Sequence, residues 1–254
     1  MNDFSLEGKV AVIIGGSKGL GKGIAQGFVK AGATVISASR NIKELEAVKS
    51  EIEEGTQGSC FAVELDITSV EAISKFVNKV DKEFKRIDIL VNSAGINIRK
   101  NALDFEEDDW DSVMNIQLKY VFFMNQAIAR YMISKKIKGK IINMASLTSV
   151  LGFKKMVAYC AAKGGIVQLT KALANEWAEY GINVNAIAPG YYLTEMTKPL
   201  LEDENVLNNM IQNIPQKRLG EPKDLVGAAV LLASNASEYI TGQVIYVDGG
   251  WLIE

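Results

Sequence analysis

A tyrosine and a lysine stand four residues apart in the segment Tyr159-Cys160-Ala161-Ala162-Lys163. This spacing places both side chains on one face of a helix. A free phenol has a pKa of about 10 and is a poor base at neutral pH, but a neighbouring ammonium stabilises the phenolate. Lowering this pKa by about three units requires about 4 kcal/mol, which demands a close, desolvated cation such as Lys163. The pair is suited to proton transfer.

A serine hydroxyl could complete this group. Ser146 follows the apolar run Ile141-Ile142-Asn143-Met144-Ala145. Because ligands bind at the carboxyl ends of the strands in open parallel sheets, this hydroxyl could hydrogen-bond a substrate oxygen. Taken singly, a Tyr and a Lys at helical spacing are more often a surface pair, so the hypothesis depends on the combination.

The composition excludes several other chemistries. The chain has 254 residues, no histidine and two cysteines. Histidine relays and His-ligated zinc are therefore excluded, and without CxxC spacing we expect no metal site. The 28 Lys and Arg nearly balance the 30 Asp and Glu, without long like-charge runs. We therefore expect a small-molecule partner, and neither nucleic acid nor a membrane surface.

The first residues, MNDFSLEGKVAVII, contain acids and only a short apolar run. This run is too short for a secretory signal or a membrane span. Neither Cys60 nor Cys160 has the surroundings of a disulfide framework, which favours a reducing compartment. We expect a cytoplasmic protein.

A glycine-rich turn, Gly15-Gly16-Ser17-Lys18-Gly19-Leu20-Gly21, follows the first apolar run. Glycines permit unusual φ angles and let backbone N–H groups approach a phosphate at the positive end of a helix. The turn indicates nucleotide binding, and a purely structural tight turn is the alternative. The stretch nearly fits a P-loop, GxxxxGK, but Gly23 stands where a hydroxyl would hold magnesium. A nucleoside-triphosphate hydrolase is thus a minor alternative.

The end of the second apolar run indicates which dinucleotide binds. A carboxylate there would bond the ribose 2′-OH of NAD, whereas an Arg would pair with the 2′-phosphate of NADP. Here the run ends in Ser39-Arg40-Asn41, and the first acid, Glu44, lies within the following helix. With Lys18 as a second cation, we expect NADP(H), with NAD(H) the less favoured cofactor. The alternative is that Arg40 is merely a solvated charge.

These residues must be positioned by a parallel sheet, because β-branched runs alternate with longer amphipathic stretches along the whole chain. Most of the runs lack polar alternation, as expected for strands covered on both faces. The predicted strands are Val10–Ile14, Thr34–Ser39, Ser59–Glu64, Ile87–Asn92, Lys140–Met144, Asn183–Ala188 and Val244–Val247. The predicted helices include Leu20–Ala31, Ile42–Glu54, Val70–Phe84, Asp108–Ile133, Met156–Tyr180 and Lys223–Ala233.

Right-handed crossovers would wind these elements into one doubly wound α/β Rossmann domain covering residues 1–254. The segment from Pro189 to Glu221 adds no strand and contains Pro199 and Pro215. Insertions of this length are usually functional. We therefore expect a substrate lid around residues 191–216.

The motifs taken together resemble those of the short-chain dehydrogenases/reductases, and the resemblance covers the whole chain. Gly15, Gly19 and Gly21 match the glycine motif, and Asn92-Ser93-Ala94-Gly95 matches NNAG. Ser146, Tyr159 and Lys163 have the family's spacing. Asp66 matches the adenine-contacting acid, and Pro189-Gly190-Tyr191-Tyr192-Leu193-Thr194 matches PGxxxT.

This resemblance implies hydride transfer between a nicotinamide and a carbinol or carbonyl carbon. Tyr159 would exchange the hydroxyl proton, Ser146 would polarise the oxygen, and Lys163 would hold the ribose and depress the Tyr159 pKa. Thr194 would contact the carboxamide. The implied cofactor-binding residues are Gly15, Ser17, Lys18, Gly19, Leu20, Gly21, Ser39, Arg40, Asn41, Asp66, Ile67, Asn92, Ala94, Gly95, Tyr159, Lys163, Pro189, Gly190, Tyr192 and Thr194.

One member of the family's catalytic tetrad is changed. The segment Asn115-Ile116-Gln117-Leu118-Lys119-Tyr120 resembles D-x-N-L-K-G, with Gln117 in the place of the catalytic Asn. Glutamine keeps the amide and adds a methylene, so a proton path to Lys163 could be preserved or displaced. We expect an active enzyme, and a non-enzymatic NADP-binding protein is the alternative.

Within the family, the sequence resembles the gluconate 5-dehydrogenases and the related 2-deoxygluconate or 2-dehydro-3-deoxygluconate dehydrogenases. A sugar acid brings a carboxylate, which Arg99 or Lys100 could bind by charge-assisted hydrogen bonds, unless both are only exposed loop cations. Ser146 and Tyr191 could also line the substrate site. The resemblance implies a homotetramer. A 3-oxoacyl-[acyl-carrier-protein] reductase shares every cofactor motif, but this acidic chain shows no clear basic docking patch.

Overall fold

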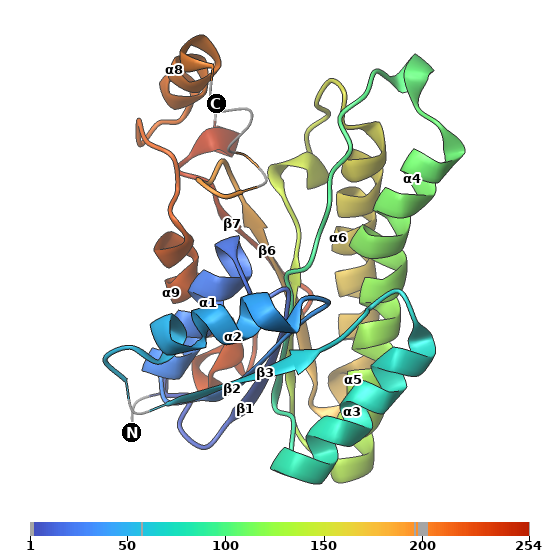
Figure 1. Ribbon diagram of the computed structural model, residues 1–254, viewed down its shortest axis with the longest axis vertical. Coiled ribbons are helices and arrows are strands. Elements are labelled where there is room, and N and C mark those ends of the chain that lie inside the picture. Colours follow the sequence, from blue (N-terminus) through green and yellow to red (C-terminus); the bar gives the residue numbers. More distant parts are fainter. Residues whose placement is uncertain (1–2, 57, 196, 198–202, 254) are drawn as a thin grey trace.

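The computed structural model describes residues 3–56, 58–195, 197 and 203–253, and its helices surround a central sheet (Figure 1). Within this part of the chain the sheet has seven parallel strands, in the order β3-β2-β1-β4-β5-β6-β7. Strands β2 and β3 extend the sheet on one side of β1, and β4 to β7 extend it on the other side. The topological switch point therefore lies between β1 and β4. The strands are β1 (Val10–Ile14), β2 (Thr34–Ser39), β3 (Ser59–Glu64), β4 (Ile89–Asn92), β5 (Lys140–Met144), β6 (Asn183–Pro189) and β7 (Val244–Val247).

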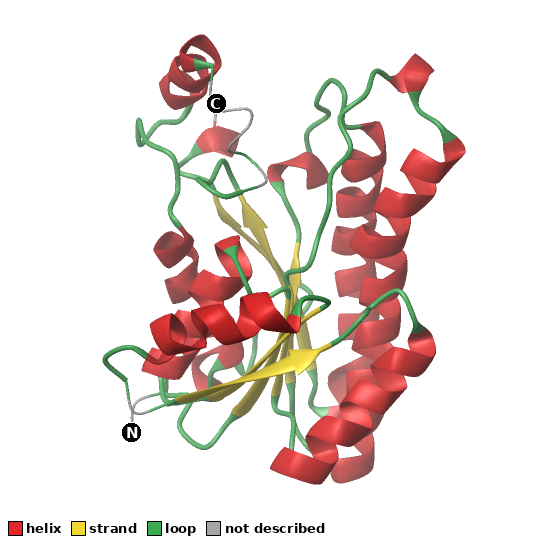
Figure 2. Cartoon of the chain, in the orientation of Figure 1, coloured by secondary structure: helices red, strands yellow, loops and turns green. Residues whose placement is uncertain are grey.

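Helices pack on both faces of the sheet (Figure 2). One layer contains α1 (Gly19–Lys30), α2 (Ile42–Glu53) and α9 (Val226–Ala233), and the other contains α3 (Val70–Phe84), α5 (Tyr120–Lys135) and α6 (Val157–Trp177). Side chains along a strand point to alternate faces. In β1, Val12 and Ile14 pack with α3 and α5, whereas Ala11 and Ile13 pack with α1 and α9. The unbroken apolar run of β1 is explained by this burial on both faces.

The sequence prediction of a single Rossmann-like domain with a doubly wound, seven-stranded parallel sheet is confirmed. Strand bounds differ by at most two residues, at the start of β4 and at the end of β6. The sequence predicted that β4 begins at Ile87, two residues before its observed start at Ile89. At this point the Asp88 carboxylate, in place of a strand carbonyl, accepts the hydrogen bond of the Val10 N–H at 2.9 Å.

The long helix predicted over Asp108–Ile133 is interrupted. It consists of α4 (Glu107–Met114), a π-helical turn (Asn115–Lys119) and α5. A π-helical turn accommodates one extra residue and is frequent at functional sites. The turn contains Gln117, the residue in the place of the tetrad Asn.

The helices predicted near the C-terminus also differ in part. Residues 178–180 and 222–225 form 3-10 turns that adjoin α6 and α9. Helix α8 (Glu204–Asn213) was missed, although its N-cap signal is in the sequence, since the Asp203 carboxylate accepts from the N–H groups of Asn205 and Val206. No helix in the described residues is long and apolar enough to span a membrane.

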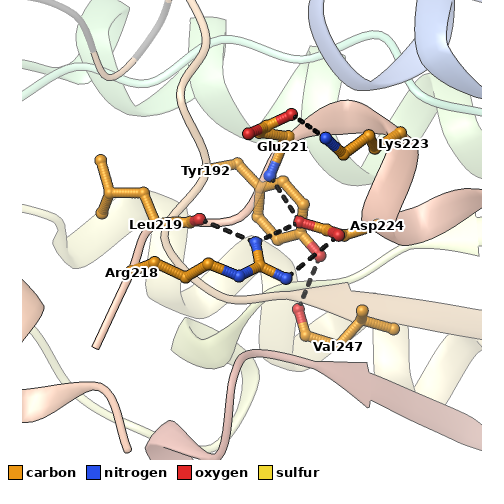
Figure 3. A network of polar contacts seen from close by, with 7 residues as sticks. All are labelled: Tyr192, Arg218, Leu219, Glu221, Lys223, Asp224 and Val247. Atoms are coloured by element: carbon orange, nitrogen blue, oxygen red, sulfur yellow. Dashed lines mark hydrogen bonds and ion pairs between the residues drawn. The ribbon is translucent and has the colours of Figure 1, made fainter. Parts of the chain in front are cut away.

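The two ends of the strandless segment from Pro189 to Glu221, which contains the predicted lid, are joined beside β7 (Figure 3). Tyr192 forms a parallel bridge with Gly220, and its hydroxyl donates to the Val247 carbonyl at 3.0 Å. The Arg218 guanidinium donates to both carboxylate oxygens of Asp224, at 2.6 and 3.2 Å. Within the segment, residues 196 and 198–202 lie outside the described residues, so the lid at 191–216 stays a prediction.

Candidate active site

A cleft of about 490 Å³ lies at the carboxyl ends of the strands. Its walls come from the segments that follow the six strands β1 to β6, from the π-helical turn and from α6. This is the place at which open parallel sheets bind their ligands. Most of the residues predicted from the sequence line it: Gly15, Ser17, Lys18, Gly19, Leu20, Gly21, Ser39, Arg40, Asn41, Ile67, Ala94, Gly95, Gln117, Ser146, Tyr159, Lys163, Pro189, Gly190, Tyr192 and Thr194.

In the glycine turn, backbone segments lie too close together to admit a side chain at Gly15 or Gly21. A Cβ on Gly21 would lie 2.2 Å from the Gly15 carbonyl oxygen, and one on Gly15 would lie 2.7 Å from the Ala94 nitrogen. Gly19 begins α1 with a φ of +56°, and no side chain caps this helix. The first N–H groups of α1 therefore remain available to a phosphate at the positive end of the helix.

The P-loop alternative is not supported by the position of Lys22. A P-loop lysine reaches the phosphates. Here the Lys22 ammonium lies 2.5 Å from a carboxylate oxygen of Glu51 on α2. The lysine of the GxxxxGK pattern thus joins two helices.

One end of the cleft is bordered by Ser17, Lys18, Arg40 and Asn41, as expected for the adenosine end of a dinucleotide site. Glu44 also lines this end, and its carboxylate lies 3.2 Å from the Lys18 ammonium. The sequence predicted two cations and no acid at this place. That prediction is corrected, because the first turn of α2 directs Glu44 back toward the glycine turn.

Two predicted cofactor residues are not among those that line the cleft. The Asp66 carboxylate accepts hydrogen bonds from the backbone N–H and the hydroxyl of Thr68, at 2.9 and 2.7 Å. Asn92 is buried beneath the cleft, and its amide donates to Asn125 at 2.6 Å and to Asn143 at 2.9 Å. Asn92 thus supports the site from the core.

Ser146, Tyr159 and Lys163 converge on the cleft from β5 and α6. Ser146 follows β5 and caps a short 3-10 turn, where its hydroxyl oxygen accepts from the Thr148 N–H at 3.2 Å. Ser149 links this turn to α6, since its hydroxyl donates to the Lys163 carbonyl at 2.9 Å. The Lys163 ammonium lies 5.5 Å from the centre of the Tyr159 ring. The sequence placed Tyr159 and Lys163 together by their helical spacing, and Ser146 by its position after a predicted strand.

Burial controls the ionisation of this pair. Desolvation raises the pKa of Tyr159 to about 12, against the opposing effects of a hydrogen bond with Ser146 and the charge of Arg99. Burial lowers the pKa of Lys163 to about 7, and its side chain donates to the Met144 carbonyl at 2.6 Å. The shift of the Tyr159 pKa is upward, opposite to the downward shift predicted from the sequence, because desolvation of the phenol outweighs the groups that favour the phenolate.

Gln117 is almost fully buried within the π-helical turn. Its amide nitrogen donates to the Ile96 carbonyl at 2.6 Å, and a Cβ on Gly95 would lie 2.7 Å from the same nitrogen. Its amide oxygen is buried and has no hydrogen-bond partner among the described residues. The longer side chain therefore fits against the loop after β4 and holds it.

Of the predicted substrate residues, Ser146 lines the cleft, whereas Arg99 and Tyr191 lie outside its lining. The charge of Arg99 lowers the pKa values of both Tyr159 and Tyr191, although burial raises each of them more strongly. Tyr191 packs edge-on against Trp251 and Phe153, at centroid distances of 4.8 and 6.3 Å. Arg99 is therefore close enough to affect the proton-transfer group.

Lys100, the other cation considered for a substrate carboxylate, is engaged elsewhere. Its ammonium is hydrogen-bonded to the Asp109 carboxylate and lies 3.9 Å from that of Glu106. Within the described ranges, Arg99 forms no ion pair. Of the two neighbouring cations, Arg99 is the one that remains available to an anionic ligand.

Several lining residues were not predicted: Ile14, Ala38, Glu44, Leu65, Ser93, Ile96, Ile116, Met144, Ala145, Glu195 and Thr197. Most are sequence neighbours of predicted residues at strand ends, so the rule that ligands bind at carboxyl ends could have found them. Glu44 lies in a helix, and the sequence offers no such signal for it.

Comparisons with known proteins identify the family of this chain. A family model described as enoyl-(acyl carrier protein) reductase matches residues 15–252. The 2-dehydro-3-deoxy-D-gluconate 5-dehydrogenase of Escherichia coli is 43% identical over 99% of this chain and 98% of its own. The gluconate 5-dehydrogenase of Gluconobacter oxydans is 40% identical, over 97% and 96% of the two chains. A crystal structure of a gluconate 5-dehydrogenase from Burkholderia cenocepacia, in complex with NADP and tartrate, superposes with a TM-score of 0.94 at 35% identity, over 100% of this chain and 98% of that one.

The parallel sheet, the glycine turn and the Ser, Tyr and Lys group define a nicotinamide-dependent oxidoreductase. This chain belongs to the short-chain dehydrogenase/reductase family. The resemblance predicted from the sequence motifs is confirmed.

Proposed function

We propose that this chain uses NADP(H) to interconvert a hydroxyl and a ketone on a sugar acid, with gluconate and 5-dehydrogluconate as the first candidates. One observation carries the proposal. Ser146, Tyr159 and Lys163 meet in one cleft, and the charge of Arg99 acts on the Tyr159 hydroxyl. A site that combines a proton-transfer group with an available cation suits a substrate that has both a secondary alcohol and a carboxylate.

The residues present fit a dinucleotide. Close backbone approaches leave no room for a Cβ at Gly15 or Gly21, and the uncapped start of α1 opens to the cleft beside Lys18. A bound nicotinamide supplies hydride chemistry, which none of the protein side chains offers. The glycine turn would hold the phosphates, and Arg40 and Lys18 would hold a 2′-phosphate. We propose Lys163 for the ribose and Thr194 for the carboxamide.

The remaining steps fall to the chain's own side chains. Ser146 would hydrogen-bond the substrate oxygen, and Tyr159 would take up or return the hydroxyl proton. With a pKa of about 7, Lys163 can hold or release a proton at neutral pH, 5.5 Å from the Tyr159 ring centre. Gln117 would keep the loop after β4 in position through the Ile96 carbonyl.

A second candidate substrate is 2-dehydro-3-deoxygluconate, which is favoured by the relative from Escherichia coli. Both candidates would react at a secondary hydroxyl and present a carboxylate. Initial rates with NADP(H) and NAD(H), on gluconate, 5-dehydrogluconate, 2-deoxygluconate, 2-dehydro-3-deoxygluconate and an acetoacetyl thioester, distinguish them. Turnover of the thioester alone would identify the acyl-carrier-protein reductase alternative. NADPH binding without any turnover would identify the non-enzymatic alternative.

Arg99→Ala tests the assignment of the carboxylate site. We expect it to raise KM for the preferred sugar acid by about tenfold or more, because a charge-assisted hydrogen bond contributes about 1.5–3 kcal/mol. The KM for an uncharged polyol should change little. Lys100→Ala is the matched control, since Lys100 is bound to Asp109. Equal effects of Arg99→Ala on charged and uncharged substrates would remove Arg99 from the substrate site.

A further inference from the structure

The adenosine end of the cleft contains a carboxylate that a 2′-phosphate would have to face. Glu44 is the third residue of α2, and its backbone N–H is fixed by the side chain of the N-cap residue Asn41 at 3.3 Å. Its side chain reaches the glycine turn, where one oxygen lies 3.2 Å from the Lys18 ammonium and accepts from the Ser17 hydroxyl at 3.4 Å. Glu44 thereby bridges the two loops that border this end.

The Lys18–Glu44 pair remains accessible to a ligand. The side chains are 61% and 43% exposed, and both line the cleft. Arg40 lines the same end, and its charge acts in part on Asp66. The formal charge presented by Lys18, Arg40 and Glu44 is therefore +1, whereas the two cations alone would present +2.

We propose that Glu44 determines how strongly this site discriminates between NADP(H) and NAD(H), by competing with the cofactor 2′-phosphate for Lys18. The inference rests on the proposed function, because it places the adenosine half of the cofactor at this end of the cleft. A phosphate monoester carries about 1.5–2 negative charges at neutral pH, so it is repelled by Glu44 and must take Lys18 from it. A ribose hydroxyl is neutral and can donate a hydrogen bond to the Glu44 carboxylate.

A purely structural role predicts something different. An acid in the first turn of a helix is favoured by the helix dipole, whatever ligand is present. The chain offers a matched control in Glu51, which also lies on α2 and also pairs with a lysine, Lys22 of α1, at 2.5 Å. Glu51 is not among the lining residues.

The test is calorimetric titration of adenosine 2′,5′-bisphosphate and adenosine 5′-monophosphate into the wild-type protein, Glu44→Gln and Glu51→Gln. We expect Glu44→Gln to tighten binding of the bisphosphate by about threefold to fivefold, the size of an exposed charge interaction, and not to tighten binding of the monophosphate. Glu51→Gln should change neither. Added KCl should reduce the gain, because exposed charges are screened.

Lys18→Gln supplies the second half of a double-mutant cycle. If competition for Lys18 is the mechanism, Glu44→Gln should give a much smaller gain when Lys18 is already replaced. Equal effects of Glu44→Gln on both ligands, or an equal gain from Glu51→Gln, would overturn the inference and leave the proposed function intact. Failure of the wild-type protein to bind either adenosine compound would overturn both.

Discussion

Lys163 is a buried amine whose ionisation is determined by its surroundings. It is 5% exposed, and burial lowers its pKa to about 7. An unfolded lysine titrates at about 10.4, so between these pH values the unfolded chain binds more protons than the folded chain. The Lys163 contribution to the free energy of unfolding therefore increases as pH rises from about 7 toward 10. The absence of histidine leaves few other groups to titrate at the lower end of this window.

We predict that Lys163→Met makes the unfolding free energy less dependent on pH. The wild-type protein should gain stability from pH 7 to pH 9 in urea titrations, because it need not keep a buried ammonium at the higher pH. The variant should lose most of that gain. Lys171→Met, an exposed position on the same helix, is the control. Parallel pH profiles for wild type and Lys163→Met would contradict the buried, neutral state of this amine.

At the scale of elements, a network of buried amides joins the strands beneath the cleft to the helices behind them. Asn92 of β4 and Asn125 of α5 both donate to the Asn143 side-chain oxygen of β5, at 2.9 and 3.1 Å. Asn143 in turn donates to the Thr170 hydroxyl of α6 at 3.1 Å. The network ties β5, which leads to Ser146, to the helix that presents Tyr159 and Lys163. It therefore holds together the two elements of the proton-transfer group.

Thr170→Val should destabilise the protein by about 1–3 kcal/mol, because it leaves a donor of Asn143 buried without a partner. Thr148→Val is the matched control. Thr148 is also buried, but its hydroxyl has no hydrogen-bond partner in the described part of the chain, so its removal should cost little. Chemical denaturation of both variants measures the difference. Equal losses would show that the network contributes no more than packing.

At the scale of the whole molecule, parts of the surface are suited to contacts with another chain. Strand β7 is at the edge of the sheet, and each residue from Val244 to Val247 is only partly buried. Trp110 of α4 and Val157 of α6 are 38% and 40% exposed. An edge strand with apolar side chains is a template for pairing with another chain.

We predict a homotetramer, as the family resemblance implies. Light scattering coupled to size-exclusion chromatography should give about four times the 27.7 kDa of one chain. If Trp110 is buried between protomers, Trp110→Asp places an unpaired charge there and should shift the population to smaller species. A monodisperse monomer at micromolar concentration would contradict the prediction, without affecting the proposed chemistry.

The sequence by itself determined the features that depend on neighbouring residues. Apolar runs set the strands to within two residues, because strands buried on both faces need continuous apolar side chains. The glycine turn and the Tyr159 and Lys163 spacing identified the cleft, since glycine conformations and the helical repeat are local properties.

Only the tertiary structure decided the features that depend on distant charges and on burial. It paired Lys18 with Glu44 and Lys100 with Asp109, and it left Arg99 available. It also reversed the expected direction of the Tyr159 pKa, because desolvation depends on how β5 and α6 enclose the phenol. Electrostatic energies depend on distance and surroundings in space, and separation along the chain specifies neither.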